Sequence, residues 1–298
     1  MARRAVAGAS GHLTTRVLAQ GDGWIVQDVV CTCGPQDRPF EERHSRVSIA
    51  IVVAGSFQYG SAGARELMTP GSLLLGNAGQ CFECGHEHGS GDRCLSFQYA
   101  PDYFETLAAD AGARGSKWDF RVLRLPPLRA LASLVARACA ALAAGAGAPW
   151  EELNVQLAAQ SVQQVKGLSP GLGTVPASAL ARVTRAVRMI ERNPSAELGI
   201  GTLARESGLS PYHFLRTFDH LTGMTPHQYI VRSRLREAAT RLSTETSKVL
   251  DVALDCGFAD LSNFNRAFRI EFGMNPRAYR RQANAVAWRD PVSSPPGR

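Results

Sequence analysis

The 298-residue sequence has no apolar run long enough to cross a bilayer, which argues against a membrane-spanning helix. Its first residues, Met1-Ala2-Arg3-Arg4, lead into a polar, glycine-rich stretch instead of the apolar segment of a signal peptide. Seven cysteines, an odd number, do not suit the disulfide framework of a secreted protein. A phosphate loop, a nucleophile elbow and a paired-acid motif are also absent. We therefore expect a cytoplasmic protein that is not an enzyme.

Basic residues are unevenly distributed along the chain, and nearly all of them are arginine. Residues 1–176 carry 15 Lys and Arg against 15 Asp and Glu, whereas residues 177–285 carry 16 against 10. With 45% apolar residues, the chain can form two hydrophobic cores. A neutral first domain and a basic second domain fit a regulatory module joined to a module that binds phosphates.

Residues 200–281 contain one pattern twice, which indicates two copies of a supersecondary unit. The first part recurs 49 residues later, so that Ala204, Gly208 and Leu209 match Ala253, Gly257 and Phe258. The second part recurs 50 residues later and comprises Phe214, Arg216, Phe218, Gly223, Pro226 and Tyr229. One residue is therefore inserted just after the glycine of the second copy.

The residue pattern of each copy predicts a helix, a turn and a second helix. The alanine allows close helix contact, and Gly208 or Gly257 ends the first helix where φ must be positive. Ser210 can cap the second helix of the first copy, with Pro211 at its first position, and Asp260 can cap its counterpart. This arrangement is the helix-turn-helix.

The second helix of each copy has one apolar and one polar face. Phenylalanine pairs at i, i+4 spacing turn one face to the core, namely Phe214 with Phe218 and Phe264 with Phe268. The outward face then carries Tyr212, His213, Leu215 and Arg216 in one copy and Ser262, Asn263, Asn265 and Arg266 in the other. Arginine suits guanine edges and asparagine suits adenine edges, so these helices are equipped to read bases.

The doubled pattern, with G-M-x-P-x-x-Y closing each half, resembles the AraC/XylS family of transcriptional regulators over about 100 residues. The resemblance implies that the segments after Ser210 and Asp260 are recognition helices, and that promoter DNA and RNA polymerase are partners. The resemblance also places seven residues at positions that face DNA: Tyr212, Leu215, Arg216, Ser262, Asn263, Asn265 and Arg266. Leu215 is apolar at a position where the family commonly has a polar residue. It suits an apolar contact with the methyl group of thymine and does not suit a hydrogen bond.

Short β-type runs fill the region from Trp24 to Tyr99, and glycine and proline break them. They are residues 24–30, 48–53, 72–75 and 94–99, and they predict a small antiparallel sandwich or barrel. The resemblance implies a cupin-like β-barrel that senses a ligand, with the run E-L-M-x-P-G-S-L-L-L as one of its hairpins.

Two Ala/Leu-rich segments, residues 127–144 and 150–167, predict a helical hairpin. The resemblance implies that helices placed here mediate a homodimer, and the alternative is that the hairpin only covers the barrel. The fold class is thus α+β with two domains: a cupin-like domain with a helical hairpin, and an all-α domain of two helix-turn-helix repeats joined by a helix. Its expected parts are a mobile N-terminus (1–20), a sensor or dimerisation domain (21–166), a linker (167–178), a DNA-binding domain (179–284) and a tail (285–298).

A dense group of cysteines and histidines occupies residues 81–88, near the end of the predicted β region. If this segment is a strand, Cys84, His86 and His88 share one face, and Cys94 on the returning strand can join them. Thiolate and imidazole suit zinc or another transition metal. Two alternatives stay open: the group only packs, or a thiol pair such as Cys31/Cys33 or Cys81/Cys84 senses redox state.

The leading hypothesis is a sequence-specific DNA-binding regulator whose N-terminal domain senses an effector or a metal. The alternative is a metal-dependent cupin-like enzyme with an appended DNA-binding domain. That alternative needs a nearby acid or base, yet Glu83 and Glu87 would point to the strand face opposite His86 and His88. A β domain that only dimerises is the third possibility.

Overall fold

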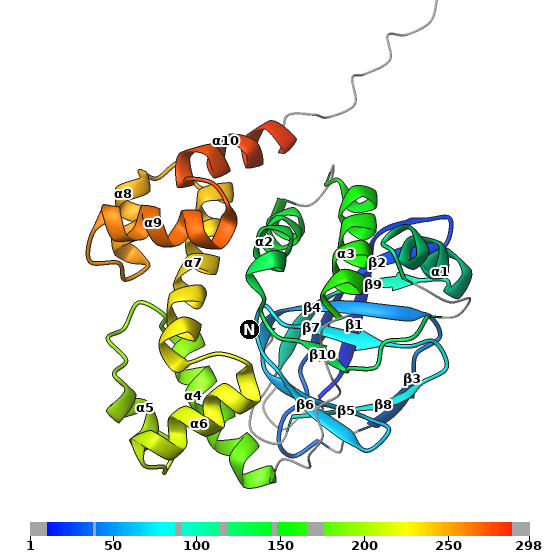
Figure 1. Ribbon diagram of the computed structural model, residues 1–298, viewed down its shortest axis with the longest axis horizontal. Coiled ribbons are helices and arrows are strands. Elements are labelled where there is room, and N and C mark those ends of the chain that lie inside the picture. The colour runs from blue at the N-terminus through cyan, green and yellow to red at the C-terminus, as the bar shows by residue number, and fades with distance from the viewer. Residues whose placement is uncertain are drawn as a thin grey trace, which may run out of the picture.

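The computed structural model describes residues 11–37, 40–86, 91–113, 118–144, 148–165 and 176–287. A β-rich N-terminal domain with three helices packs beside a C-terminal domain of seven helices (Figure 1). No helix among these residues is long and apolar enough to cross a membrane. Most of the linker expected at 167–178, and the last eleven residues of the expected tail, lie outside the described residues.

Two antiparallel sheets form the N-terminal domain and face one another across an interior cavity. The larger sheet has the order β1 (Leu13–Gly21), β2 (Trp24–Cys31), β9 (Asp92–Tyr99), β4 (Val47–Gly55), β7 (Leu73–Gly76) and β10 (Arg124–Leu125). The smaller sheet has the order β3 (Phe40–Arg43), β8 (Cys81–Gly85), β5 (Phe57–Ser61) and β6 (Ala64–Met68).

Two expectations about the strands were wrong. Leu13–Gly21 is a strand and not part of a mobile N-terminus; it is an edge strand with mostly exposed residues, so it carries little hydrophobic pattern. The E-L-M-x-P-G-S-L-L-L run is not a hairpin, because β6 pairs with β5 while β7 pairs with β4 and β10. Pro70 and Gly71 instead form a corner at which the chain passes from one sheet to the other, with Gly71 at φ 86°.

The larger sheet carries most of its large apolar residues on the outside of the barrel. On β9, Leu95, Phe97 and Tyr99 belong to the main hydrophobic core, whereas the alternate residues face the cavity. Three helices cover that apolar face: α1 (Pro101–Asp110), α2 (Arg129–Ala144) and α3 (Trp150–Val165). The predicted helical hairpin, α2 and α3, therefore covers the barrel.

The C-terminal domain comprises α4 (Ala177–Arg192), α5 (Ile200–Glu206), α6 (Pro211–Thr222), α7 (Pro226–Thr244), α8 (Val249–Asp255), α9 (Leu261–Phe272) and α10 (Pro276–Ala287). Helices α5 and α6 form one helix-turn-helix, α8 and α9 form the other, and α7 joins them (Figure 1). Each unit has its own hydrophobic cluster.

The predicted caps and turns are present in both repeats. The His213 backbone N–H donates to Ser210 Oγ at 3.4 Å, and the Asn263 N–H donates to Asp260 Oδ1 at 2.7 Å. Gly208 and Gly257 lie in the left-handed region at φ 63° and 87°. The two turns therefore have the same geometry, although the segment after Gly257 is one residue longer.

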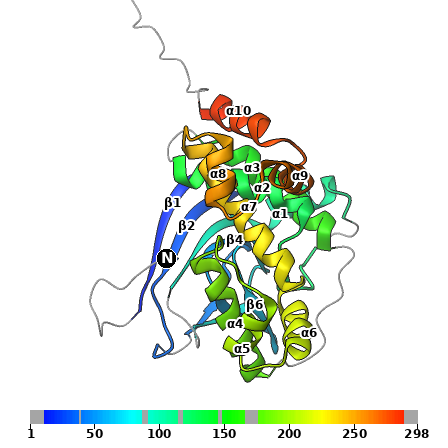
Figure 2. The same cartoon turned by 90° about the vertical axis from the view of Figure 1, so that its left-hand side faces the viewer.

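Helix α2 makes the most extensive contact between the two domains. This helix packs against α7 and α9 on one side and against the larger sheet on the other, as Figures 1 and 2 show. Ala136 of α2 is buried in the same cluster as Leu235 and Phe268 of the C-terminal domain. A single helix thus contributes to the cores of both domains.

We expect the turn glycine of the second repeat to be essential for stability. A Cβ at position 257 would lie 2.8 Å from Ser195 Cα, and φ is also left-handed there, so Gly257→Ala should lower the free energy of unfolding by about 1–3 kcal/mol. Gly201, in α5, has nothing within 4 Å of its Cβ direction, so Gly201→Ala should be neutral or stabilising by up to about 1 kcal/mol. Chemical denaturation of both variants tests this difference, and equal stabilities would contradict it.

Candidate nucleic-acid interface and barrel cavity

Helices α6 and α9 present the same arrangement of side chains. Phe214 and Phe218 are fully buried with ring centroids 5.4 Å apart, and Phe264 and Phe268 repeat that distance. An edge-to-face tyrosine follows each pair, Tyr229 at 5.6 Å from Phe218 and Tyr279 at 5.4 Å from Phe268. These aromatic contacts fix which face of each helix turns outward.

All seven residues expected to face DNA are exposed. Tyr212 has 63% of its surface exposed, and the Arg216 guanidinium lies 5.8 Å from the centroid of its ring. On α9, Arg266 Nη2 donates to Asn263 Oδ1 at 3.4 Å. On the outer face of each helix, the arginine therefore contacts a neighbouring side chain: Tyr212 in α6 and Asn263 in α9.

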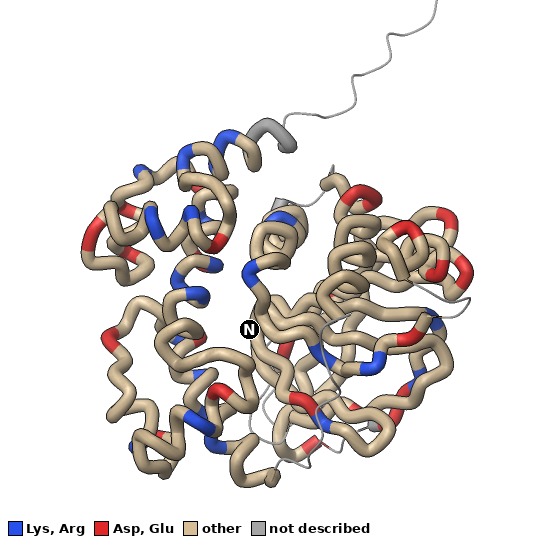
Figure 3. Tube along the Cα trace, viewed as in Figure 1, with Lys and Arg blue, Asp and Glu red and all other residues tan. Residues whose placement is uncertain are grey.

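Cations are frequent along the C-terminal helices, and Figure 3 shows them on α7, α9 and α10. Several of these side chains are exposed, including Arg205, Arg216, Arg266, Arg269, Arg277 and Arg281. The sequence excess of cations in residues 177–285 is thus available to a polyanion.

The barrel cavity, enclosed by both sheets, has a volume of about 320 Å³. Along the larger sheet its walls mix polar residues, such as Gln27 and Ser96, with apolar ones, such as Val29, Ala50 and Leu74. The smaller sheet contributes apolar and aromatic walls, including Phe57, Phe82 and Cys84. A cavity of this size with a few polar groups suits a small organic molecule.

His44 is the cavity residue that sequence reasoning missed. Its Nε2 lies 2.8 Å from the Tyr59 hydroxyl, and its ring stacks on Phe82 with centroids 4.1 Å apart. Burial lowers the pKa of His44 to about 4, so the ring is neutral at pH 7. Burial also raises the pKa of Tyr59, so a neutral tyrosine lies behind the neutral His44 of the cavity wall.

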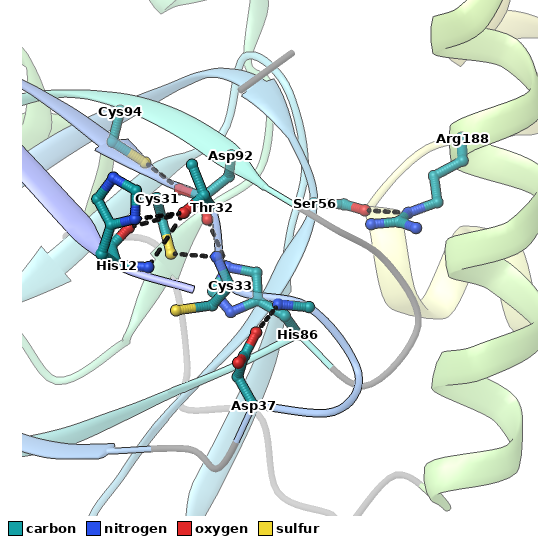
Figure 4. A network of polar contacts seen from close by, with 11 residues as sticks. His12, Cys31, Thr32, Cys33, Asp37, Ser56, His86, Asp92, Cys94 and Arg188 are labelled. Carbon is teal, nitrogen blue, oxygen red and sulfur yellow. Dashed lines mark hydrogen bonds and ion pairs between the residues drawn. The ribbon is translucent and has the colours of Figure 1, made fainter. Parts of the chain in front are cut away.

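The predicted metal ligands do not share one face of a strand. Strand β8 ends at Gly85, so the alternation on which the set depended stops before His86, and His88 lies outside the described residues. Cys84 and Cys94 line the barrel cavity, but His86 instead meets Asp92, with Nε2 and Oδ2 2.5 Å apart. Figure 4 shows His86, Asp92 and Cys31 close together.

All seven cysteines are free thiols. Burial raises the pKa of Cys31 to about 12, and it raises the pKa of Cys84 and Cys94 well above the usual value. Because the thiolate is the reactive form, this environment disfavours oxidation of these three thiols. Cys33 is also buried, whereas Cys81 is half-buried. Cys81 lies opposite Arg43 in the backbone register of β3 and β8.

Glu83, one of the two acids considered for the enzyme alternative, does not line the cavity. Glu83 lies on β8 with 40% of its side chain exposed and forms an ion pair with Arg65 at 3.5 Å. Glu87 lies outside the described residues. The cavity wall contains Glu42, which comes from β3.

Two family models match the chain: a helix-turn-helix domain over residues 203–282 and an AraC-like ligand binding domain over residues 26–162. The regulatory protein SoxS of Salmonella typhimurium is 34% identical over 32% of this chain and 88% of its own length. This chain belongs to the AraC family of transcriptional regulators. The predicted family and the predicted α+β fold, with a cupin-like domain before the helix-turn-helix repeats, are confirmed.

Two further relatives of this AraC-family chain are transcriptional activators. AarP of Providencia stuartii is 35% identical over 30% of this chain and 67% of its own length. RhaS of Pectobacterium carotovorum is 36% identical over 32% of this chain, but the match spans only 34% of RhaS. The similarity to these relatives therefore covers about a third of the present chain.

We expect His44 to make the protein less stable in mild acid. The unfolded histidine takes up a proton near pH 6.5, whereas the folded one stays neutral down to about pH 4. The unfolded state therefore binds more protons in this window, and the free energy of unfolding falls as the pH is lowered through it. His44→Gln should show a shallower fall in denaturation series from pH 7 to 4; identical slopes would contradict a buried neutral His44.

Proposed function

We propose that this AraC-family chain is a sequence-specific DNA-binding transcriptional regulator whose N-terminal domain binds an effector and alters how the C-terminal domain engages promoter DNA. The observation that carries the proposal is the matched pair of helices α6 and α9. Both turn the same positions outward, and both carry an exposed arginine at the equivalent position, Arg216 and Arg266. We refer to α6 and α9 as the recognition helices.

The outward residues suggest how each recognition helix would read DNA. Two helix-turn-helix units in one chain can enter successive major-groove segments about one helical turn apart. Arg216 and Arg266 suit guanine, Asn263 and Asn265 suit adenine, and Leu215 suits the methyl group of thymine. Exposed arginines elsewhere on the C-terminal helices would hold phosphates and fix the register.

The first recognition helix is held at its C-terminal end by the N-terminal domain. Arg124, on β10, donates from Nη2 to the Leu221 carbonyl at 3.0 Å, while its Nε donates to Glu66 at 3.0 Å. The Leu221 and Thr222 carbonyls lie in the last turn of α6, where a cation is favourable. A change in the smaller sheet, which contains Glu66, would therefore reach α6 through Arg124.

The second recognition helix is held by α2. Glu271 of α9 forms ion pairs with Arg129 of α2 at 3.7 Å and with Arg232 of α7 at 3.2 Å, and Arg232 also donates to the Pro127 carbonyl. Arg129 lines the same surface hollow as Asn263 and Arg266. We infer that effector binding in the barrel cavity shifts α2 and Arg124, and so changes the relative placement of the recognition helices.

We also propose that RNA polymerase is a partner at the promoter and that the protein acts in the cytoplasm. Two of the related proteins are transcriptional activators, which supports an activating role. Because α7 and α9 already cover one side of α2, a homodimer through the helical hairpin would use α3, where Val155 is exposed. Solution scattering of the purified chain would measure that oligomeric state.

We expect Arg266→Ala to weaken binding selectively. An operator is first selected from random DNA with the full chain, and affinities are then measured on that operator and on unrelated DNA. Loss of a bidentate base contact should cost about 1–3 kcal/mol on the operator and less on unrelated DNA. Arg269→Ala, on an exposed position one turn further along α9, is the control and should weaken both DNAs alike. Equal losses on both DNAs for Arg266→Ala would make it a phosphate contact.

We expect the contact between the domains to depend on α2. Ala136 is 9% exposed within the cluster of the second repeat, so Ala136→Arg would bury a charge there and separate the domains. The control is Ala130→Arg, because Ala130 is exposed on the same helix. Small-angle scattering should give a larger radius of gyration for Ala136→Arg alone, and superimposable curves for all three proteins would contradict the arrangement.

A further inference from the structure

Three buried side chains of metal-ligating types lie together at one end of the barrel cavity. Cys31, His86 and Asp92 each offer one ligand atom, and these three atoms lie within 4.8 Å of one another. All three residues are buried, at 3%, 6% and 5% exposure. They come from the end of β2, the segment after β8 and the start of β9, so only the fold brings them together.

We propose that Cys31, His86 and Asp92 bind one divalent cation of borderline softness, such as Zn²⁺, with a coordination position left open towards the barrel cavity. A sulfur, an imidazole nitrogen and a carboxylate oxygen form a donor set that zinc accepts. The bonds are about 2.0–2.3 Å long, so tetrahedral ligand atoms lie roughly 3.5 Å apart. The three atoms lie within 4.8 Å of one another and His86 Nε2 is 2.5 Å from Asp92 Oδ2, so side-chain rotations would bring them to that spacing.

The surroundings of the cluster suit a bound cation. The backbone N–H of Cys33 donates to Cys31 Sγ at 3.4 Å, and this hydrogen bond would orient the sulfur as a ligand. Asp92 carries a carboxylate into a buried position, and a cation would offset the cost of burying that charge. On binding, the metal replaces the thiol proton of Cys31 and that proton passes to solvent, so that the charges balance.

Cys31 and Asp92 also line the barrel cavity, and this determines where the open position points. Cys94, next but one to Asp92 on β9, lines the same wall with its Sγ 3.6 Å from Asp92 Oδ1. Sites with three protein ligands and one exchangeable ligand are typical of zinc that meets a small molecule. The metal would thus bind a water or an anionic group of the effector at the cavity end.

Ser56 links the neighbourhood of the site to the C-terminal domain. Gly55 pairs with Asp92 across β4 and β9, and Phe57 stacks on His86 with ring centroids 5.9 Å apart. Ser56, between them, is buried and accepts a hydrogen bond from Arg188 Nε of α4 at 3.3 Å (Figure 4). A movement of either ligand on metal binding would therefore displace Ser56 and reach the helix that opens the C-terminal domain.

Metal titration of the full chain tests the site. Protein stripped with a chelator under reducing conditions, without a histidine tag, is titrated with ZnSO₄ by calorimetry and with CoCl₂ by absorption. We expect one equivalent to bind, a sulfur-to-cobalt charge-transfer band that Cys31→Ser abolishes, and affinity at least about tenfold weaker in Cys31→Ser and Asp92→Asn. Cys81→Ser, a half-buried thiol of the same barrel, is the control and should bind like the wild type.

The proposal is overturned if the wild type binds no stoichiometric metal, or if the ligand variants, folded by circular dichroism, bind as tightly as Cys81→Ser. The link to α4 has a separate readout: zinc should change the affinity for the selected operator about fivefold or more in the wild type and not in Asp92→Asn. Unchanged affinity with zinc bound would overturn that link. The proposed function is tested independently, because metal-free protein should still select an operator.

Discussion

The alternation of side chains along the larger sheet is the constraint on which the rest of the structure depends. On β9 the odd positions, Leu95, Phe97 and Tyr99, point outward into the main core, and the even positions, Asp92 to Gln98, point into the barrel cavity. The apolar face must be covered, and α1, α2 and α3 cover it. The inward face combines polar residues that line the cavity with Ala50, Val52, Leu74 and Cys94, which form a second hydrophobic cluster with residues of the smaller sheet.

Covering the sheet also determines how the domains meet. Helix α2 uses Leu131, Leu134 and Val135 against the sheet and Ala132 and Ala136 against the C-terminal domain. The small alanines allow α7 and α9 to approach closely. The element that stabilises the β domain is consequently the one that touches the second recognition helix, which gives the cavity a short physical route to the DNA-reading surface.

Most of the C-terminal domain could be predicted because its pattern is local and doubled. The caps at Ser210 and Asp260, the glycines at 208 and 257, and the phenylalanine pairs all act within one repeat, so spacing alone places them. The first strand was missed because Leu13–Gly21 lies at an edge and is mostly exposed. The hairpin expected around Pro70 was wrong because a turn motif indicates a change of direction and does not indicate which strand pairs with which.

The sequence by itself determined the family, the two domains and the outward faces of the recognition helices, because those features depend on residues a few positions apart. It also drew attention to the cysteine and histidine residues near the end of β8. Only the tertiary structure decided which of them meet: His86 lies beyond the last strand residue, and its partners Cys31 and Asp92 lie on two other strands. Strand pairing sets those contacts, with Cys31 opposite Asp92 across β2 and β9, and pairing between distant strands depends on the packing of the whole sheet.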